Sequence, residues 1–266
     1  MKKILLLLVV SQLSFGQSKI SNFMNERRNK KENRWANEHV YRTSALALTS
    51  QSFQQQVFSQ NQFSGLGLAY FSSNLVDRPK IQRGFENYIG ITPFLKAAQS
   101  TSTSYSVNAM FGYFYLKKMN ESLAIGGQLN ALIGGRLNGN YDNNSVSAEA
   151  IIELAPKLHY AKTFRFLKKN LELNYTLSAS ILGFGFWTPT YTANFTQNGI
   201  GLLSPKNYNH FNSRIMLKLP AGKRFINFSP TIGYGWNAYV LQANSEQKII
   251  NATHSIYLIA HIQKLK

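Results

Sequence analysis

The sequence predicts an all-β protein, an antiparallel transmembrane β-barrel of about ten strands with short periplasmic turns and longer external loops. Three observations predict this fold. Apolar and polar residues alternate along most of the chain, the alternating segments are joined by connections of alternating length, and the N-terminus is typical of an exported protein.

The N-terminus has the features of a secretory signal peptide. Two lysines precede the apolar run Ile4–Val10, and the small residues Ser14 and Gly16 precede the expected cleavage site. The apolar run is too short to cross a bilayer as a helix. We therefore expect an exported protein.

The chain is expected to divide into three parts. Residues 1–16 form the signal peptide, residues 17–33 a basic periplasmic segment, and residues 34–266 the barrel. This division predicts a location in the cell outer membrane.

The alternation is clearest in residues 171–181, where odd positions are apolar or aromatic and even positions are polar or charged. Successive side chains of a strand point to opposite faces, so this segment has one apolar and one polar face. A soluble β-protein is the alternative, but its strands centre on about 5–6 residues, whereas crossing hydrocarbon takes roughly 9–11. The predicted strands are 34–49, 62–73, 81–94, 103–116, 122–134, 147–161, 170–183, 210–219, 225–237 and 252–263.

Aromatic residues gather near the strand ends, as membrane-interface girdles require. The pairs are Tyr70 and Phe71, Tyr113 and Tyr115, Phe186 and Trp187, and Tyr234 and Trp236.

Connection lengths support an even number of strands, which returns both ends of the barrel to the periplasm. The short connections are 74–80, 117–121, 162–169 and 220–224, and the generally longer ones are 50–61, 95–102, 135–146, 184–209 and 238–251. Twelve strands are the alternative, with an extra hairpin in which Tyr191–Phe195 pairs with Ile200–Leu203.

The formal charge is +18. The four short turns hold ten basic residues against Asp77 and Glu121, whereas the long loops hold only Lys96, Arg136, Lys206 and Lys248 as basic residues. We expect this basic periplasmic rim to contact anionic outer-membrane lipid or to dock an acidic periplasmic protein. Export argues against nucleic acid as the partner. The rim comprises Lys117, Lys118, Lys162, Arg165, Lys168, Lys169, Lys223 and Arg224.

The polar faces of the best strands predict a charge network that plugs a narrow lumen. A hairpin turn near Arg165 and Phe166 would place Glu172 opposite His159. Charges in a poorly hydrated lumen are costly unless paired. The network comprises Glu149, Glu153, Lys157, His159, Glu172, Arg214 and Lys218.

Enzymatic arrangements are not supported. His254 and Ser255 are adjacent in a predicted strand and therefore point to opposite faces. Glu149 and Glu153 lie about 13 Å apart along a strand, farther than the roughly 9.5 Å of paired glycosidase carboxylates. The sequence has no Cys and no metal-ligand cluster, so we expect neither an enzyme nor a cofactor.

The whole mature sequence resembles small outer-membrane β-barrels of the Bacteroidota. The resemblance rests on the signal ending Ser-Phe-Gly-Gln, the absence of Cys, the period-two strands and the Asn/Gln/Ser-rich basic composition. The most family-like segments are Leu173–Ser178, Ile181–Phe184 and Thr188–Tyr191. Phe63–Leu68 is similar to the barrel family associated with type IX secretion and gliding. The resemblance implies an architecture and no activity.

Together these observations favour a non-catalytic outer-membrane barrel that serves as a structural or interaction component of the cell envelope. A secretion assembly is one such envelope complex. A narrow channel or transporter for small polar solutes is the alternative. An outer-membrane lipid hydrolase is the third candidate.

Overall fold

The computed structural model describes residues 38–55, 59–98, 103–138, 146–188, 199–220, 228–242 and 248–264. The chain divides into two units, Met1–Glu38 and His39–Lys266, and all described strands belong to the second. The predicted signal peptide and the basic segment 17–33 lie outside the described residues.

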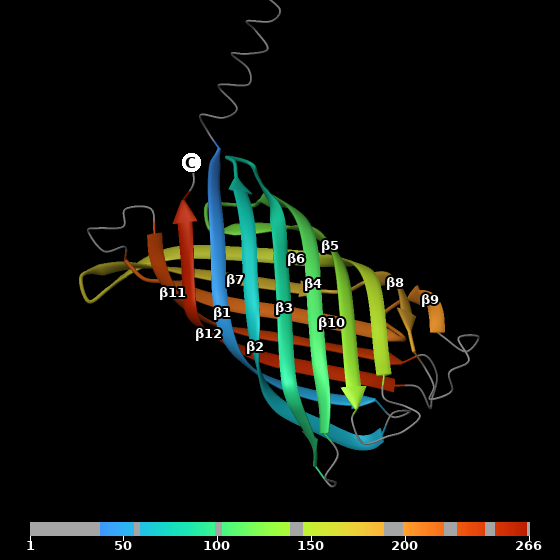
Figure 1. Cartoon of the computed structure of the whole chain (residues 1–266). Helices are drawn as coiled ribbons and strands as arrows, with labels where there is room; N and C mark the ends of the chain where they lie inside the picture. The colour runs from blue at the N-terminus through green and yellow to red at the C-terminus, as the bar shows by residue number, and fades with distance from the viewer. Residues whose placement is uncertain are drawn as a thin grey trace, which may run out of the picture. The chain divides into compact units, whose positions relative to one another are not determined.

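The second unit is a closed antiparallel barrel of ten strands with two additional short strands, β8 and β9 (Figure 1). This confirms the predicted fold class. No helix among the described residues is long and apolar enough to cross a membrane. The strands are β1 His39–Gln55, β2 Ser59–Asp77, β3 Ile81–Ala97, β4 Thr103–Lys118, β5 Leu123–Asn138, β6 Val146–Phe166, β7 Lys169–Ala179, β8 Leu182–Trp187, β9 Gly199–Leu203, β10 Tyr208–Lys218, β11 Phe228–Gln242 and β12 Lys248–Lys264.

The barrel closes by pairing its first and last strands, from Tyr41 opposite Lys264 to Gln55 opposite Ile249. Each barrel strand pairs with its neighbours in the chain, except that β10 pairs with β7. This exception arises because β8 and β9 form a hairpin between them, and β8 continues along β6 beyond the end of β7.

The additional hairpin differs from the twelve-strand alternative. Ile200–Leu203 lies in β9 as that alternative requires, but its partner is β8. The proposed partner Tyr191–Phe195 lies outside the described residues.

We call the end of the barrel that holds the start of β1 and the end of β12 the turn end, and the opposite end the loop end. The turn end also carries the connections 78–80, 119–122 and Leu167–Lys168. The last is a two-residue turn with positive φ at both residues, 47° and 62°. This turn lies two residues beyond the predicted one, so Glu172 is opposite Thr163 and not His159.

Most strands extend farther toward the loop end than predicted. β1 runs to Gln55 and β2 begins at Ser59, so most of the predicted loop 50–61 is strand. Lys96 lies in β3 and Arg136 in β5. The prediction that these two bases belong to external loops is wrong, because the pairing ladders continue through both segments.

The outer face is apolar, as a lipid-facing surface must be. On β4, exposed side chains run from Tyr105 to Tyr115, with Val107, Phe111 and Tyr113 between them. Ten residue steps at about 3.3 Å and a tilt of about 40° give a height of about 25 Å, which matches the apolar band of outer-membrane barrels.

The girdle prediction holds only in part. Five of the predicted residues are exposed, and Phe71 and Trp187 are buried. The exposed ones are Tyr70, Tyr113, Tyr115, Tyr234 and Trp236. Phe71 and Trp187 point inward because alternation places neighbouring side chains on opposite faces.

Candidate functional site

The candidate site is the lumen, where charged and polar side chains from most strands meet. Three layers follow one another from the loop end to the turn end, and each contains one charged residue of β6: Glu149, Glu153 and Lys157. All three side chains are buried. We name the layers after Arg136, Glu153 and Glu86.

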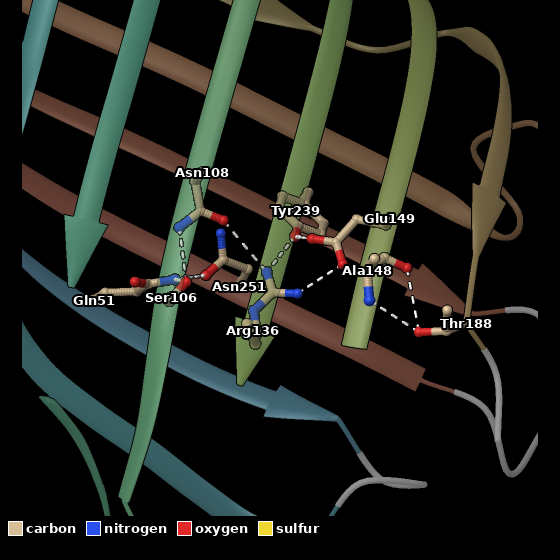
Figure 2. A network of polar contacts seen from close by, with 9 residues as sticks. All are labelled: Gln51, Ser106, Asn108, Arg136, Ala148, Glu149, Thr188, Tyr239 and Asn251. Carbon is tan, nitrogen blue, oxygen red and sulfur yellow. Dashed lines mark hydrogen bonds and ion pairs between the residues drawn. The ribbon is translucent and has the colours of Figure 1, made fainter. Parts of the chain in front are cut away.

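The Arg136 layer is built on one guanidinium group, drawn in Figure 2. Arg136 on β5 donates from NH1 to Glu149 Oε2 on β6 at 2.6 Å and from NH2 to the Tyr239 hydroxyl on β11 at 2.7 Å. Tyr239 in turn donates to Glu149 Oε1. The Phe53 ring of β1 packs on the guanidinium with its centroid 4.0 Å from Cζ. These contacts compensate both buried charges and join opposite walls of the barrel.

Neutral side chains extend this layer to two further strands. Gln51 on β1 donates from Nε2 to Ser106 Oγ on β4 at 3.1 Å and to Asn251 Oδ1 on β12 at 2.7 Å (Figure 2). Asn108 Nδ2 also donates to Ser106 Oγ, at 3.1 Å. The hydrogen bonds therefore cross the lumen.

An apolar cluster fills the lumen around the Arg136 layer. Protein interiors of this kind are close-packed, with few voids larger than a water molecule. The cluster closes the loop-end half of the lumen within the described part of the chain. Its buried members are Phe53, Phe63, Leu95, Ala97, Met110, Leu132, Ile151, Trp187, Leu203, Tyr208, Tyr239, Leu241 and Ile249.

In the Glu153 layer, three side chains surround one carboxylate. Asn130 Nδ2 and the Tyr208 hydroxyl each donate to it at 2.7 Å, and His210 Nδ1 lies 2.6 Å from Oε1. His210 Nε2 lies 3.0 Å from Asn237 Nδ2. The Glu153 carboxylate is therefore held by side chains of β5 and β10.

The Glu86 layer brings two bases to one carboxylate. Lys157 Nζ lies 2.6 Å from Glu86 Oε2, and Arg214 NH2 lies 2.7 Å from Glu86 Oε1. Each base also packs on an aromatic ring. Lys157 Nζ is 4.4 Å from the Phe114 centroid, and Arg214 Cζ is 3.8 Å from the Phe71 centroid.

Beyond the Glu86 layer, a cavity of about 170 Å³ occupies the turn-end half of the lumen. Its walls include Lys157 and Arg214 at the inner end and Asp77 and Lys118 near the turn end. The lumen is therefore packed at one end and hollow at the other.

The predicted lumen residues lie in different parts of this arrangement. Glu149 and Glu153 belong to the first two layers, whereas Lys157 and Arg214 belong to the third. His159 Nδ1 lies 2.7 Å from Gln82 Oε1. In the turn-end half, Lys218 Nζ lies 3.1 Å from Glu172 Oε2.

The principal partners of these residues were not identified from the sequence. Glu86 lies in the least regular of the predicted inner segments, and Arg136 lies beyond the Gly134-Gly135 pair that marked the predicted end of its strand. His210 lies at the first position of the predicted strand 210–219, and its pairing with Glu153 depends on contact across the lumen. Extending the period-two pattern through the glycines would have found Arg136.

The rim residues occupy the turn end where the structure describes them. Lys117, Lys162, Arg165, Lys168 and Lys169 are exposed. Lys118 lies 2.6 Å from Asp77 Oδ1. The other two predicted members, Lys223 and Arg224, lie outside the described residues.

The sequence argument against a His–Ser pair agrees with the geometry. Ser255 is buried in the lumen, whereas His254 lies on the outer face, with Nδ1 2.5 Å from the Tyr234 hydroxyl. Within the described ranges, no group of three or more His, Asp or Glu side chains is arranged to hold a metal ion.

Comparison with solved structures shows an outer-membrane barrel fold. The chain is similar to the outer membrane protease OmpT from Escherichia coli, with a TM-score of 0.53 and 8% identity over 85% of this chain and 97% of that chain. The toluene transporter TodX from Pseudomonas putida gives a TM-score of 0.32 and 6% identity over 85% and 90% of the two chains. An outer membrane channel from Pseudomonas putida F1 gives 0.30 and 9% over 86% and 96%. No family model and no curated protein matches by sequence.

Proposed function

We propose that this chain is a non-catalytic barrel of the cell outer membrane that serves as a structural or interaction component of the envelope. A secretion assembly is one envelope complex to which it could belong. The observation that carries the proposal is the packed loop-end half of the lumen, where, among the described residues, the Arg136 layer and the apolar cluster occupy the space that an open porin channel would need. The exposed apolar band supports the membrane location. The sequence resemblance supports an origin in the Bacteroidota.

In this proposal the basic rim at the turn end faces the periplasm and makes the functional contact. Five of its residues are exposed, so their charges are available to anionic lipid or to an acidic protein. The structural role thus combines a closed lumen with a charged docking edge.

A narrow channel for small polar solutes is the second candidate, and the turn-end cavity favours it. Planar-bilayer recording separates the two. The closed barrel is expected to give no stable conductance steps, with a porin and protein-free bilayers as controls. Any stable conductance step would contradict the proposal: steps well below a nanosiemens would support the narrow channel, and nanosiemens-scale steps would indicate a wide porin.

The interaction role is tested by charge reversal. Lys168→Glu with Lys169→Glu is expected to remove co-purifying envelope proteins at physiological salt, because it reverses two exposed rim charges. The matched control is Lys206→Glu with Lys248→Glu, which makes the same charge change at the loop end. If the rim variant keeps every co-purifying protein, the docking role is wrong.

A further inference from the structure

The Glu86 layer carries an excess positive charge. Lys157 and Arg214 contribute two positive charges, and the ion pairs they form among the described residues are both with Glu86, which contributes one negative charge. The sum is +1. All three side chains are buried, so solvent screens this charge poorly.

The excess charge lies at the wall of the turn-end cavity, which Lys157, Arg214 and Glu86 all line. The acids nearer the turn end are largely compensated, because Asp77 pairs with Lys118 and Glu172 pairs with Lys218. Glu121 lines the cavity from the β4–β5 connection, outside the Glu86 layer. The inner end of the cavity therefore favours an anion.

Part of the inner wall is apolar and aromatic, and Ser73 and Thr176 add hydroxyl groups at the same level. Phe71 and Phe114, whose rings pack on the two bases, line the cavity together with Leu116 and Met216. An apolar cavity of about 150 Å³ is large enough to hold benzene. The volume of about 170 Å³ thus accommodates a ring or a short aliphatic chain that carries one acidic group.

We propose that this cavity is a binding site for a small organic carboxylate with an apolar body, which enters from the turn end. The carboxylate contacts Lys157 and Arg214, and the body packs against Phe71 and Phe114. The site is independent of the envelope role proposed above, since it requires only the barrel interior.

The test uses the full chain in detergent micelles and fluorine NMR titration of 4-fluorobenzoate, with empty micelles as a blank. The neutral analogue 4-fluorobenzyl alcohol has nearly the same shape. Saturable binding of the benzoate is expected, with the alcohol at least about tenfold weaker because it lacks the charge. Absence of saturable binding, or equal binding of the two probes, would overturn the proposal.

Variants locate the site. Arg214→Gln removes the excess charge but leaves Lys157 to pair with Glu86, and it is expected to weaken benzoate binding about tenfold or more. Lys168→Gln makes the same charge change outside the cavity and is expected to bind like the native chain. Native-like binding by Arg214→Gln would overturn the assignment.

A second pair of variants keeps the test decisive if Arg214→Gln does not fold. Ala161→Phe fills the cavity from a wall position and is expected to abolish binding of both probes. Glu86→Gln removes the competing acid and is expected to bind benzoate at least as tightly as the native chain. Undiminished binding by Ala161→Phe, or loss of binding in Glu86→Gln, contradicts the proposed site.

Discussion

Arg136 shows how single residues hold the lumen closed. Its side chain is fully buried, and its charge is tolerated because Glu149, Tyr239 and Phe53 surround it. Gly134 makes the arrangement sterically feasible, since a Cβ at that position would overlap the Glu149 carboxylate. The Arg136–Glu149 ion pair therefore requires glycine at position 134.

Replacing Arg136 with Met is expected to lower the free energy of unfolding by about 3–5 kcal/mol, because Glu149 would remain as a buried charge without a cation. Urea unfolding in detergent micelles, followed by tryptophan fluorescence, measures the change. The double variant Arg136→Met with Glu149→Gln removes both charges and is expected to recover most of the loss. A double variant as unstable as the sum of the single variants would contradict this account.

The Glu86 layer illustrates what residue types alone could and could not predict. Period-two alternation was sufficient to place Lys157 and Arg214 in the lumen, because it assigns each residue to a face. Alternation does not say which strands face each other across a barrel. The contact between Glu86 on β3 and Arg214 on β10 therefore could not be predicted from the sequence.

At the scale of elements, the strand pattern predicted the ten barrel strands but missed the break between β7 and β8. Ile181 and Leu182 are consecutive and both are exposed, at 48% and 47%, so the alternation shifts by one residue there. A phase shift of this kind marks a bulge, which bends a strand and re-aims its side chains. The predicted strand 170–183 runs through this shift, and the rest of β8 falls in the predicted connection 184–209.

The β6–β7 turn was misplaced for a different reason. A two-residue hairpin turn with positive φ at both positions is strongly associated with Asn-Gly, and here Leu167 and Lys168 occupy those positions. The segment therefore lacks the residue types that normally identify such a turn. Both side chains are exposed, so no packing requires them.

Replacing Leu167 with Asn and Lys168 with Gly is expected to raise the free energy of unfolding by about 1–2 kcal/mol, because both residues adopt left-handed backbone conformations that cost other residues about that much. The same urea experiment measures it. Leu167→Val, which disfavours positive φ further, serves as the opposite control and is expected to lower stability. Equal stability of all three chains would show that the turn carries no strain.

At the scale of the whole molecule, apolar, packed, hollow and basic regions occupy different parts of the barrel. The outer face is apolar, the loop-end half of the lumen is packed, the turn-end half is hollow, and exposed basic residues gather at the turn end. Among the described residues, the buried bases of the lumen pair with internal acids, whereas the exposed bases of the rim face outward. Within the described ranges, it is therefore the rim that offers basic residues to a macromolecular partner.

This sorting predicts how the barrel responds to charge at different depths of its outer face. Phe111→Arg places a cation near the middle of the exposed apolar run of β4 and is expected to make folding into lipid vesicles less favourable by about 2–4 kcal/mol. Tyr105→Arg makes the same kind of change at the edge of the run and is expected to cost about 0–1 kcal/mol. The difference arises because an edge cation reaches the polar headgroups, whereas a central one remains in hydrocarbon. Urea titration of both variants in vesicles measures it. Equal costs would mean that this band does not lie in the membrane, and a soluble β-barrel would become the better description.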